Sequence, residues 1–344
     1  MKLNLSFKKM IVTTIICMLA LPLFACGKDS NNQVGNDNDV YELKFAHVVR
    51  PTTPKGMAAE EFKNKIEEKS NGRIKVTIYP DSQMGTDQEI NDQILSKTLD
   101  INAPFLSTIT SFVPEFELFD LPYLFNDSQE VHEALEGELG EKLNGYLEDK
   151  GLISLGYWSG GFKQITNSIR PVKTVKDLDG LKIRVSQSPL LVTQFRAINA
   201  GGISVPFSDL YSALQTKTVD GQENPYSNIA SKKFYEVQKH LTITDHGFMG
   251  YGLIMNKDKF ESMPEDLQGI IREVSAEVTK WQWEKTVEMD GEYLNEVIEA
   301  GMIVEEFDAE AKVEFRTATQ KAYDEFLEKK DGQMLLDLAE KYTK

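Results

Sequence analysis

An arginine near the end of a short apolar strand has the most clearly defined chemistry in this chain. The segment Gly180–Val185 reads GLKIRV, and strand periodicity puts Leu181, Ile183 and Val185 on one face and Arg184 on the other. A guanidinium is a planar fork of donors that matches a carboxylate and stays charged near neutral pH. Arg184 is therefore a candidate to bind an anion, with an ion-paired surface arginine as the plainer interpretation.

Two further segments could place other groups beside this arginine. Val205–Phe207 ends a second short strand pattern, and the ring of Phe207 could wall a pocket. Asn224 precedes Pro225, which favours extended backbone and leaves an amide that can donate and accept. A polar turn explains Asp220–Pro225 equally well. Because ligands of open α/β sheets collect at the carboxyl ends of strands, the three segments together favour a binding site.

Catalytic patterns are weak by comparison. Four histidines, His47, His132, His240 and His246, are scattered, and no pair has the spacing of a zinc site. Asp245 next to His246 is more typical of a hydrogen-bonded turn than of a catalytic dyad. The sequence has no glycine-rich phosphate loop and no nucleophile elbow. We therefore expect neither an enzyme nor a bound metal or other cofactor.

The N-terminal 25 residues predict a secretion signal. Lys2, Lys8 and Lys9 precede the apolar run Met10–Ala25, which is shorter than the roughly 20 residues of a membrane span. The run ends in LFACG, which resembles a bacterial lipobox, and Cys26 would be the only cysteine left after cleavage. We predict lipid attachment at Cys26 and an extracytoplasmic, lipid-anchored protein. An ordinary signal peptide and a retained anchor are the alternatives.

Charge and length bound the mature protein. Loss of the signal leaves 35 of the 38 basic residues against 54 acidic ones, a net charge of −19. This excess of acid disfavours nucleic-acid binding, because phosphate contacts need clustered lysine and arginine. Residues 26–40 are rich in Asn, Asp and Gly and are expected to form a flexible tether. About 300 residues remain, enough for two domains.

Alternating helix and strand patterns place the candidate residues on an α/β framework. The first set has strand patterns at 41–49, 74–78, 99–105 and 152–156, with helix patterns at 57–69, 87–97 and 128–148. The second set has strands at 180–185, 203–205 and 219–224, with helices at 189–198 and 208–215. We expect Ser208 to cap the last of these helices and Gly160-Gly161 to interrupt the chain between the sets. A strand at 251–256 returns to the first set, the helical stretch 265–300 is broken or spans two domains, and 313–342 predicts one or two helices.

The segments around the candidate residues resemble a known family. DLDGLKIRV at 177–185 and VPFSDLYSALQTKTVDGQENP at 205–225 resemble the solute-binding proteins of tripartite ATP-independent periplasmic (TRAP) transporters. The likeness runs from FAHVV at 45–49 through ELFDLPYLF at 117–125 to the C-terminal helices. Two long motifs at matching separation are far more specific than either alone.

Within this family the chain looks most like the branch that binds four-carbon dicarboxylates. YW at 157–158, GFKQ at 161–164, KFYEVQKHL at 233–241 and TDHG at 244–247 resemble that branch. The resemblance implies capture of malate, succinate or fumarate and delivery to separate TRAP membrane subunits. A sugar acid or keto acid ligand and a sensory co-receptor role are the alternatives, and an exported hydrolase lacks its nucleophile.

The resemblance also implies a fold and its boundaries. The fold is α/β and two-lobed, the periplasmic-binding-protein or Venus flytrap type, in which each lobe is a mixed sheet flanked by helices and a long helix spans the lobes. The implied segments are a signal peptide at 1–25, a tether at 26–40, lobe I at 41–161, lobe II at 162–247, a return to lobe I with the connecting helix at 248–290, and C-terminal helices packing mainly on lobe II at 291–344.

The implied site closes over a small organic anion. Arg184 would grip one carboxylate and Asn224 would hydrogen-bond it, while Lys163 would be the partner of a second carboxylate. Fixed cations and neutral donors are what a buried dianion needs, because buried charge is tolerated only when it is paired. The other implied contacts are Phe207 as packing, His47 and Ser107 from the opposite lobe, and Trp158, which is a pocket wall or a core aromatic near the hinge.

Overall fold

Two mixed sheets organise residues 39–343, the part of the chain that the computed structural model describes. The predicted signal peptide, Cys26 and nearly all of the tether lie outside these residues. The strands of the first sheet are β1 (Tyr41–Ala46), β2 (Ile74–Tyr79), β3 (Ile101–Asn102), β4 (Leu152–Phe162) and β10 (Phe248–Asn256), in the order β2-β1-β3-β10-β4. The strands of the second sheet are β5 (Gln164–Asn167), β6 (Ile183–Val185), β7 (Ile203–Ser204), β8 (Gly221–Asn224), β9 (His240–Ile243) and β11 (Ile303–Glu306), in the order β11-β9-β5-β8-β6-β7.

The first sheet begins with the strand, helix and strand unit that the sequence predicts. β1 pairs in parallel with β2, and α1 (Pro54–Lys69) connects them. Thr53 caps this helix by accepting a hydrogen bond from the backbone N–H of Gly56 at 3.1 Å. Ala58, Phe62 and Ile66 are fully buried, because their spacing puts them on the face that covers the sheet.

The chain passes from the first sheet to the second at a single residue. β4 runs through Gly160-Gly161 to Phe162, and β5 starts at Gln164 in the second sheet. Contrary to the prediction, the glycine pair lies within β4 and does not separate the two sets of strands; the chain crosses to the second sheet just after it. Gly160 lies inside a strand because β10 packs tightly there: a Cβ at this position would lie 2.8 Å from the carbonyl oxygen of Met249.

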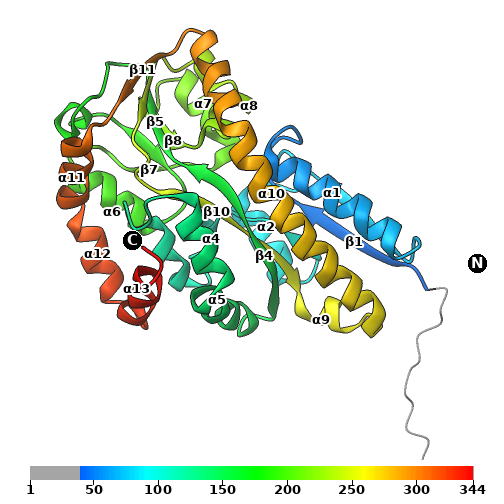
Figure 1. Ribbon diagram of the computed structural model, residues 1–344. Helices are drawn as coiled ribbons and strands as arrows, with labels where there is room; N and C mark the ends of the chain where they lie inside the picture. The colour runs from blue at the N-terminus through cyan, green and yellow to red at the C-terminus, as the bar shows by residue number, and fades with distance from the viewer. Residues whose placement is uncertain (1–38, 344) are drawn as a thin grey trace, which may run out of the picture. The chain divides into compact units, whose positions relative to one another are not determined.

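One uninterrupted helix serves both sheets. α10 (Glu265–Glu299) has 35 residues and packs on α1 and β4, which belong to the first sheet, and on α8 (Tyr226–Ser231), which follows β8 of the second. Figure 1 shows α10 running past both groups of strands. The two mixed sheets, the flanking helices and this long helix confirm the predicted fold class, whereas the predicted lobe boundaries stay a prediction.

Several elements differ from the sequence prediction in their bounds or their caps. The helix predicted over 128–148 is two helices, α4 (Ser128–Glu136) and α5 (Glu138–Glu148), which meet at the extended Gly137. Ser208 does not cap a helix: it lies in the 3-10 turn η3 (Phe207–Asp209), and its hydroxyl donates to Asp209 before α7 (Leu210–Gln215) begins. β5, β9 and β11 have no counterpart in the prediction.

The remaining helices cover the two sheets. They are α2 (Asp87–Leu95), α3 (Leu106–Ile109), η1 (Pro114–Asp120), η2 (Val175–Leu178), α6 (Pro189–Ala197), η4 (Phe234–Glu236), α9 (Lys257–Glu261), α11 (Ala309–Ala318), α12 (Gln320–Leu327) and α13 (Gly332–Glu340). Of the three C-terminal helices, α11 packs on η2 and α12 on α6, whereas α13 packs on α5 and η1. Within residues 39–343, no helix combines the length and the apolar character needed to cross a bilayer.

The core of the first sheet contains Trp158, which is fully buried. Its ring centroid lies 6.3 Å from that of Phe45, and its indole N–H donates to the hydroxyl of Thr279 on α10 at 3.1 Å. The side chain therefore connects β4 with Phe45 of β1 and with the long helix α10. Of the two sequence interpretations, a core aromatic and a pocket wall, the structure places Trp158 in the core.

We expect Trp158→Ala to lower the free energy of unfolding by about 3–5 kcal/mol, because it empties a large buried volume and leaves Thr279 without its donor. Urea denaturation of purified protein measures this loss. Trp281→Ala is the matched control, since Trp281 lies on α10 at the edge of the same core and is only partly buried. Equal losses in the two variants would contradict the central position of Trp158.

Candidate functional site

A small enclosed cavity lies where elements of the two sheets meet. Its free volume is about 20 Å³, little more than the space of one water molecule, so a larger ligand requires the walls to move apart. The first sheet and its helices contribute Val48, Val49, Lys55, Asp87, Phe105, Met249 and Tyr251, and the second sheet and its helices contribute Arg184, Ser186, Phe207, Asn224 and Asn228. All of these residues are buried. Several follow the carboxyl ends of strands, where ligands of α/β sheets bind.

Arg184 faces this cavity from β6, which lies between β7 and β8. The residue is only 2% exposed, and its Nε donates to the carbonyl oxygen of Val205 at 2.8 Å. Burial lowers the pKa of the guanidinium to about 10, against the opposing effect of the carboxylates of Glu223 and Asp87. Among the described residues, no carboxylate lies within ion-pairing distance of it, so the terminal nitrogens are free to bind a ligand.

Lys55 is a second buried cation on the opposite wall, and the sequence reasoning missed it. It lies in the first turn of α1 and is 2% exposed. Its ammonium donates to the carbonyl oxygen of Ala103 at 3.0 Å and lies 3.9 Å from the ring centroid of Tyr251. Burial lowers its pKa to about 7, and the charge of Asp87 acts in the other direction.

Asp87 brings one carboxylate to the same cavity from the first residue of α2. The helix is capped by Thr86 and Glu89 in a capping box. Burial raises the pKa of Asp87, while the charges of Lys55 and Arg184 oppose this shift. No cation of the described chain lies within 4 Å of this carboxylate, so its hydrogen-bonding capacity also faces the cavity.

Two amides complete the polar lining. Asn224, at the end of β8, accepts a hydrogen bond from Asn228 at 2.8 Å and donates to Gln222. The side-chain oxygen of Asn228 is buried without a hydrogen-bond partner in the described residues. Phe207 lines the cavity beside them. The structure therefore brings together Arg184, Asn224 and Phe207, the three residues that the strand ends suggested.

Lys163 has a different environment from the one that the resemblance implied. Its ammonium lies 2.5 Å from Glu223, and both side chains are buried. His246 lies 3.3 Å from the same carboxylate oxygen. Burial favours a neutral Glu223, but Lys163 and His246 outweigh it and lower the pKa of the carboxyl. Lys163 is not a lining residue; its ammonium lies 5.9 Å from the ring centroid of Phe105, which is.

Ser107 and His47 lie near the cavity but do not line it. The hydroxyl of Ser107 donates to Asp120, which also accepts from Ser188 at 2.6 Å. Burial raises the pKa of Asp120 to about 7. His47 precedes the lining residue Val48, and burial together with the charge of Lys55 lowers its pKa to about 3. His47 is therefore neutral at physiological pH, and direct ligand contacts of Ser107, His47, Lys163 and the core residue Trp158 stay predictions.

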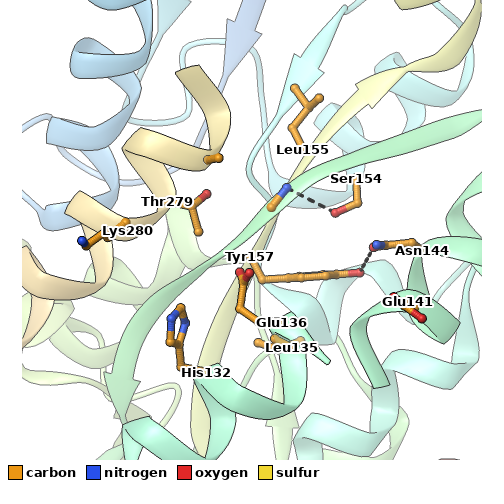
Figure 2. Close-up of a pocket in the computed structure, with 12 residues that line it drawn as sticks. His132, Leu135, Glu136, Glu141, Asn144, Ser154, Leu155, Tyr157, Thr279 and Lys280 are labelled. Carbon is orange, nitrogen blue, oxygen red and sulfur yellow. Dashed lines mark hydrogen bonds between the residues drawn. The ribbon is translucent and has the colours of Figure 1, made fainter. Parts of the chain in front are cut away.

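A second, more open hollow lies away from this cavity, between α4, α5, β4 and α10. Figure 2 shows His132, Glu136 and Glu141 around it, with the hydroxyl of Tyr157 hydrogen-bonded to Asn144 at 2.8 Å. Its charged lining consists of two glutamates and Lys280, besides the titratable His132. Two carboxylates and one lysine oppose an anion, whereas the enclosed cavity has two cations and one carboxylate.

The lining of the enclosed cavity is suited to binding a small anion rather than a metal ion. Within residues 39–343 there is no group of three His, Cys, Asp or Glu side chains that could hold a metal ion. The cavity instead presents a guanidinium, an ammonium and amides around a small volume, with aromatic side chains between them. Such a lining can neutralise and hydrogen-bond a small carboxylate-bearing molecule.

Comparisons with known proteins agree with this geometry. The model of the family "Bacterial extracellular solute-binding protein, family 7" matches residues 45–330. The chain is 36% identical to the C4-dicarboxylate-binding periplasmic protein DctP of Rhodobacter capsulatus, over 83% of this chain and 86% of that protein. It is also 34% identical to the 2,3-diketo-L-gulonate-binding periplasmic protein YiaO of Escherichia coli, over 76% of this chain and 80% of that protein.

A solved structure shares the fold. The TRAP periplasmic solute-binding protein of Sulfurospirillum deleyianum, with bound succinate, superposes with a TM-score of 0.84 at 34% identity, over 88% of this chain and 99% of that one. The chain therefore belongs to the bacterial extracellular solute-binding proteins of family 7, the DctP family of TRAP transporters, and is a transport protein rather than an enzyme.

Proposed function

We propose that this protein captures a four-carbon dicarboxylate such as malate, succinate or fumarate, and that Arg184 and Lys55 each neutralise one carboxylate. The observation that carries the proposal is a pair of buried cations on opposite walls of one cavity, neither within ion-pairing distance of a carboxylate in the described chain. Buried charges are strongly disfavoured unless they are paired. A dianionic ligand supplies both missing partners.

Lys55 takes the role in this proposal that the resemblance gave to Lys163. Glu223 already neutralises Lys163 at 2.5 Å, so a ligand carboxylate would have to compete with an internal one. Within residues 39–343, the ammonium of Lys55 contacts a carbonyl oxygen and an aromatic ring and has no carboxylate within ion-pairing distance. Asn224 and Phe207 keep their roles beside Arg184, as a hydrogen-bonding group and as packing.

A hydroxylated acid is the second candidate, and Asp87 favours it. An ionised Asp87 and the unpartnered oxygen of Asn228 are acceptors that face the cavity, and the hydroxyl groups of a sugar acid are donors. The relative YiaO, which by its name binds 2,3-diketo-L-gulonate, supports this alternative. With a dicarboxylate, a protonated Asp87 would instead donate to the ligand, which agrees with the rise of its pKa on burial.

The family works outside the cytoplasm with TRAP membrane subunits, to which a solute-binding protein delivers its ligand. We propose in addition that Cys26 carries a lipid that anchors this protein to the outer face of a membrane. The support is the sequence LFACG, since these residues lie outside the described part of the chain.

A thermal-shift screen tests the ligand class. We expect a four-carbon dicarboxylate to give the largest shift among dicarboxylates, sugar acids and keto acids, because ligand at 100 times its Kd adds about 2.7 kcal/mol of stability. Arg184→Gln should abolish this shift, since loss of one partner of a buried charge pair costs about 2–5 kcal/mol. Arg196→Gln, at an exposed position on α6, is the control and should behave as wild type. A larger shift with a sugar acid would favour the second candidate, and an unchanged shift in Arg184→Gln would contradict the proposed site.

The pH dependence of binding tests Lys55. In the ligand-free protein its pKa is lowered from 10.5 to about 7, so between these values the unfolded chain binds more protons and the empty protein gains stability as the pH rises. An anion favours protonated Lys55, so affinity for the ligand should fall above about pH 7, by at most about tenfold per pH unit. Calorimetry in two buffers of different ionisation enthalpy measures the proton uptake. Lys55→Met should weaken binding and flatten the profile, and an unaltered slope in this variant would assign the titration to Asp87 or Asp120 instead.

Cell fractionation tests the anchor. We expect the wild-type protein in the membrane fraction, released by detergent, because a covalently attached lipid partitions into the bilayer. Cys26→Ser should move it to the soluble or secreted fraction without changing ligand affinity. Membrane retention of the variant would point to an uncleaved N-terminal segment.

A further inference from the structure

The wall of the cavity is one side chain thick at Phe207, which lines both the cavity and a hollow on the outside. Phe207 is the most exposed of the lining residues, at 8%, and it lines the separate outer hollow together with Arg50, Tyr211 and Lys232. Phe207 therefore separates the cavity from solvent. Because every lining side chain is buried, a ligand can enter or leave only when parts of this wall separate.

An ion pair joins the two walls at this side. The ammonium of Lys232 lies 2.6 Å from the carboxylate of Asp81. Lys232 directly follows α8, which comes after β8 of the second sheet, and Asp81 lies in the turn after β2 of the first sheet. The same ammonium lies 5.2 Å from the ring centroid of Phe207, within the range of a cation–π contact. One side chain thus contacts both the separating ring and the opposite wall.

The Asp81 side of this contact is fixed to the cavity lining. The backbone N–H of Asp81 donates to the carbonyl oxygen of Val49 at 3.0 Å, and that of Ser82 donates to His47 at 3.3 Å. Asp81 and Ser82 both have positive φ, 52° and 62°, in a tight turn that Asp tolerates better than most residues. A displacement of Asp81 would therefore also displace Val49, which lines the cavity.

The pair is better placed than a typical surface ion pair. The side chain of Lys232 is 16% exposed and that of Asp81 39%. By contrast, Lys341 and Glu138 are also 2.6 Å apart but 52% and 64% exposed. Exposed pairs contribute little because solvent screens them, whereas partly buried pairs are screened less.

We infer that Asp81 and Lys232 form a latch that holds the cavity closed over the bound anion and so sets how long the ligand stays. Lys232 is a positioning residue: it is not among the residues that line the cavity and acts through Phe207 and Asp81. The inference rests on the proposed function, since it needs a ligand in the cavity. A latch that stabilises only the closed form slows ligand release and leaves the rate of association nearly unchanged.

Stopped-flow kinetics with the acid that gives the largest thermal shift tests the latch. Lys232→Met keeps the apolar stem over Phe207 and removes the charge, and Asp81→Asn keeps a residue that accepts positive φ. Each should raise the dissociation rate constant about fivefold or more, with the association rate constant changed by less than about twofold. The double variant should be no faster than either single variant, because both remove the same interaction.

Three controls distinguish loss of the latch from a general loss of stability. Lys341→Met removes the exposed pair of the same length and should leave both rate constants unchanged. Higher salt should speed dissociation from the wild type more than from the variants, because only the wild type has a pair to screen. The melting temperature without ligand reports any unfolding, and Asp81→Asn replaces Lys232→Met if the latter is unstable.

Wild-type dissociation rates in both single variants would overturn the latch and leave the proposed function intact. Additive effects in the double variant would also overturn it. Failure of the proposed function has a different result: a sugar acid or keto acid gives the largest thermal shift, or the wild-type protein binds no organic acid in the screen. Only the second of these results overturns the latch as well.

Discussion

Two positive charges buried on opposite walls of one small cavity constrain the rest of this structure. Arg184 and Lys55 are each 2% exposed, and a buried cation without a counter-ion is strongly disfavoured. The fold supplies only partial compensation, through the carbonyl oxygens of Val205 and Ala103 and the more distant Asp87. The lowered pKa values of both cations express the deficit. The deficit is what an anionic ligand can remove, so the electrostatics of the cavity and its proposed function have one cause.

Unlike Arg184 and Lys55, the neighbouring buried charges have partners within the protein. Lys163 and Glu223 neutralise each other at 2.5 Å, with His246 beside them. Asp120 is held by the hydroxyls of Ser107 and Ser188, from segments that follow strands of different sheets. Asp120 thus joins elements of both sheets, whereas Lys163 and His246 share one oxygen of Glu223, and its other oxygen has no hydrogen-bond partner among the described residues. Together with the long helix α10 and the pair of Asp81 and Lys232, these groups give the closed arrangement contacts that do not involve the cavity itself.

The sequence predicted the parts of the site that depend on local pattern. Strand periodicity located Arg184, and the ends of neighbouring strands located Phe207 and Asn224, because parallel strands of one sheet end at the same edge. Most helices and strands were also predictable, since the spacing of residues such as Ala58, Phe62 and Ile66 is itself the packing face. The break at Gly137 was not, because the tyrosine ring of Tyr342 that approaches it lies about 200 positions later in the chain.

Residues that depend on distant partners could not be assigned in this way. Lys55 lies before the helix predicted at 57–69, and only Ala103 and Tyr251, brought in by the sheet, show that it is buried. The pairing of Lys163 with Glu223 joins the residue just before β5 to a residue of β8, so it depends on how these strands pair. A tryptophan at position 158 could equally have been a pocket wall or a core residue, and only its neighbours in the structure show that it lies in the core. Burial and charge pairing are tertiary properties, and family resemblance alone does not fix them.

A crystal structure of the protein grown with the acid that stabilises it most tests the central claim directly. Our account predicts a single ligand in the enclosed cavity, with one carboxylate on the guanidinium of Arg184, a second on the ammonium of Lys55, and the pair of Lys163 and Glu223 intact. A ligand carboxylate bound to Lys163, with Glu223 displaced and no ligand atom near Lys55, would contradict it.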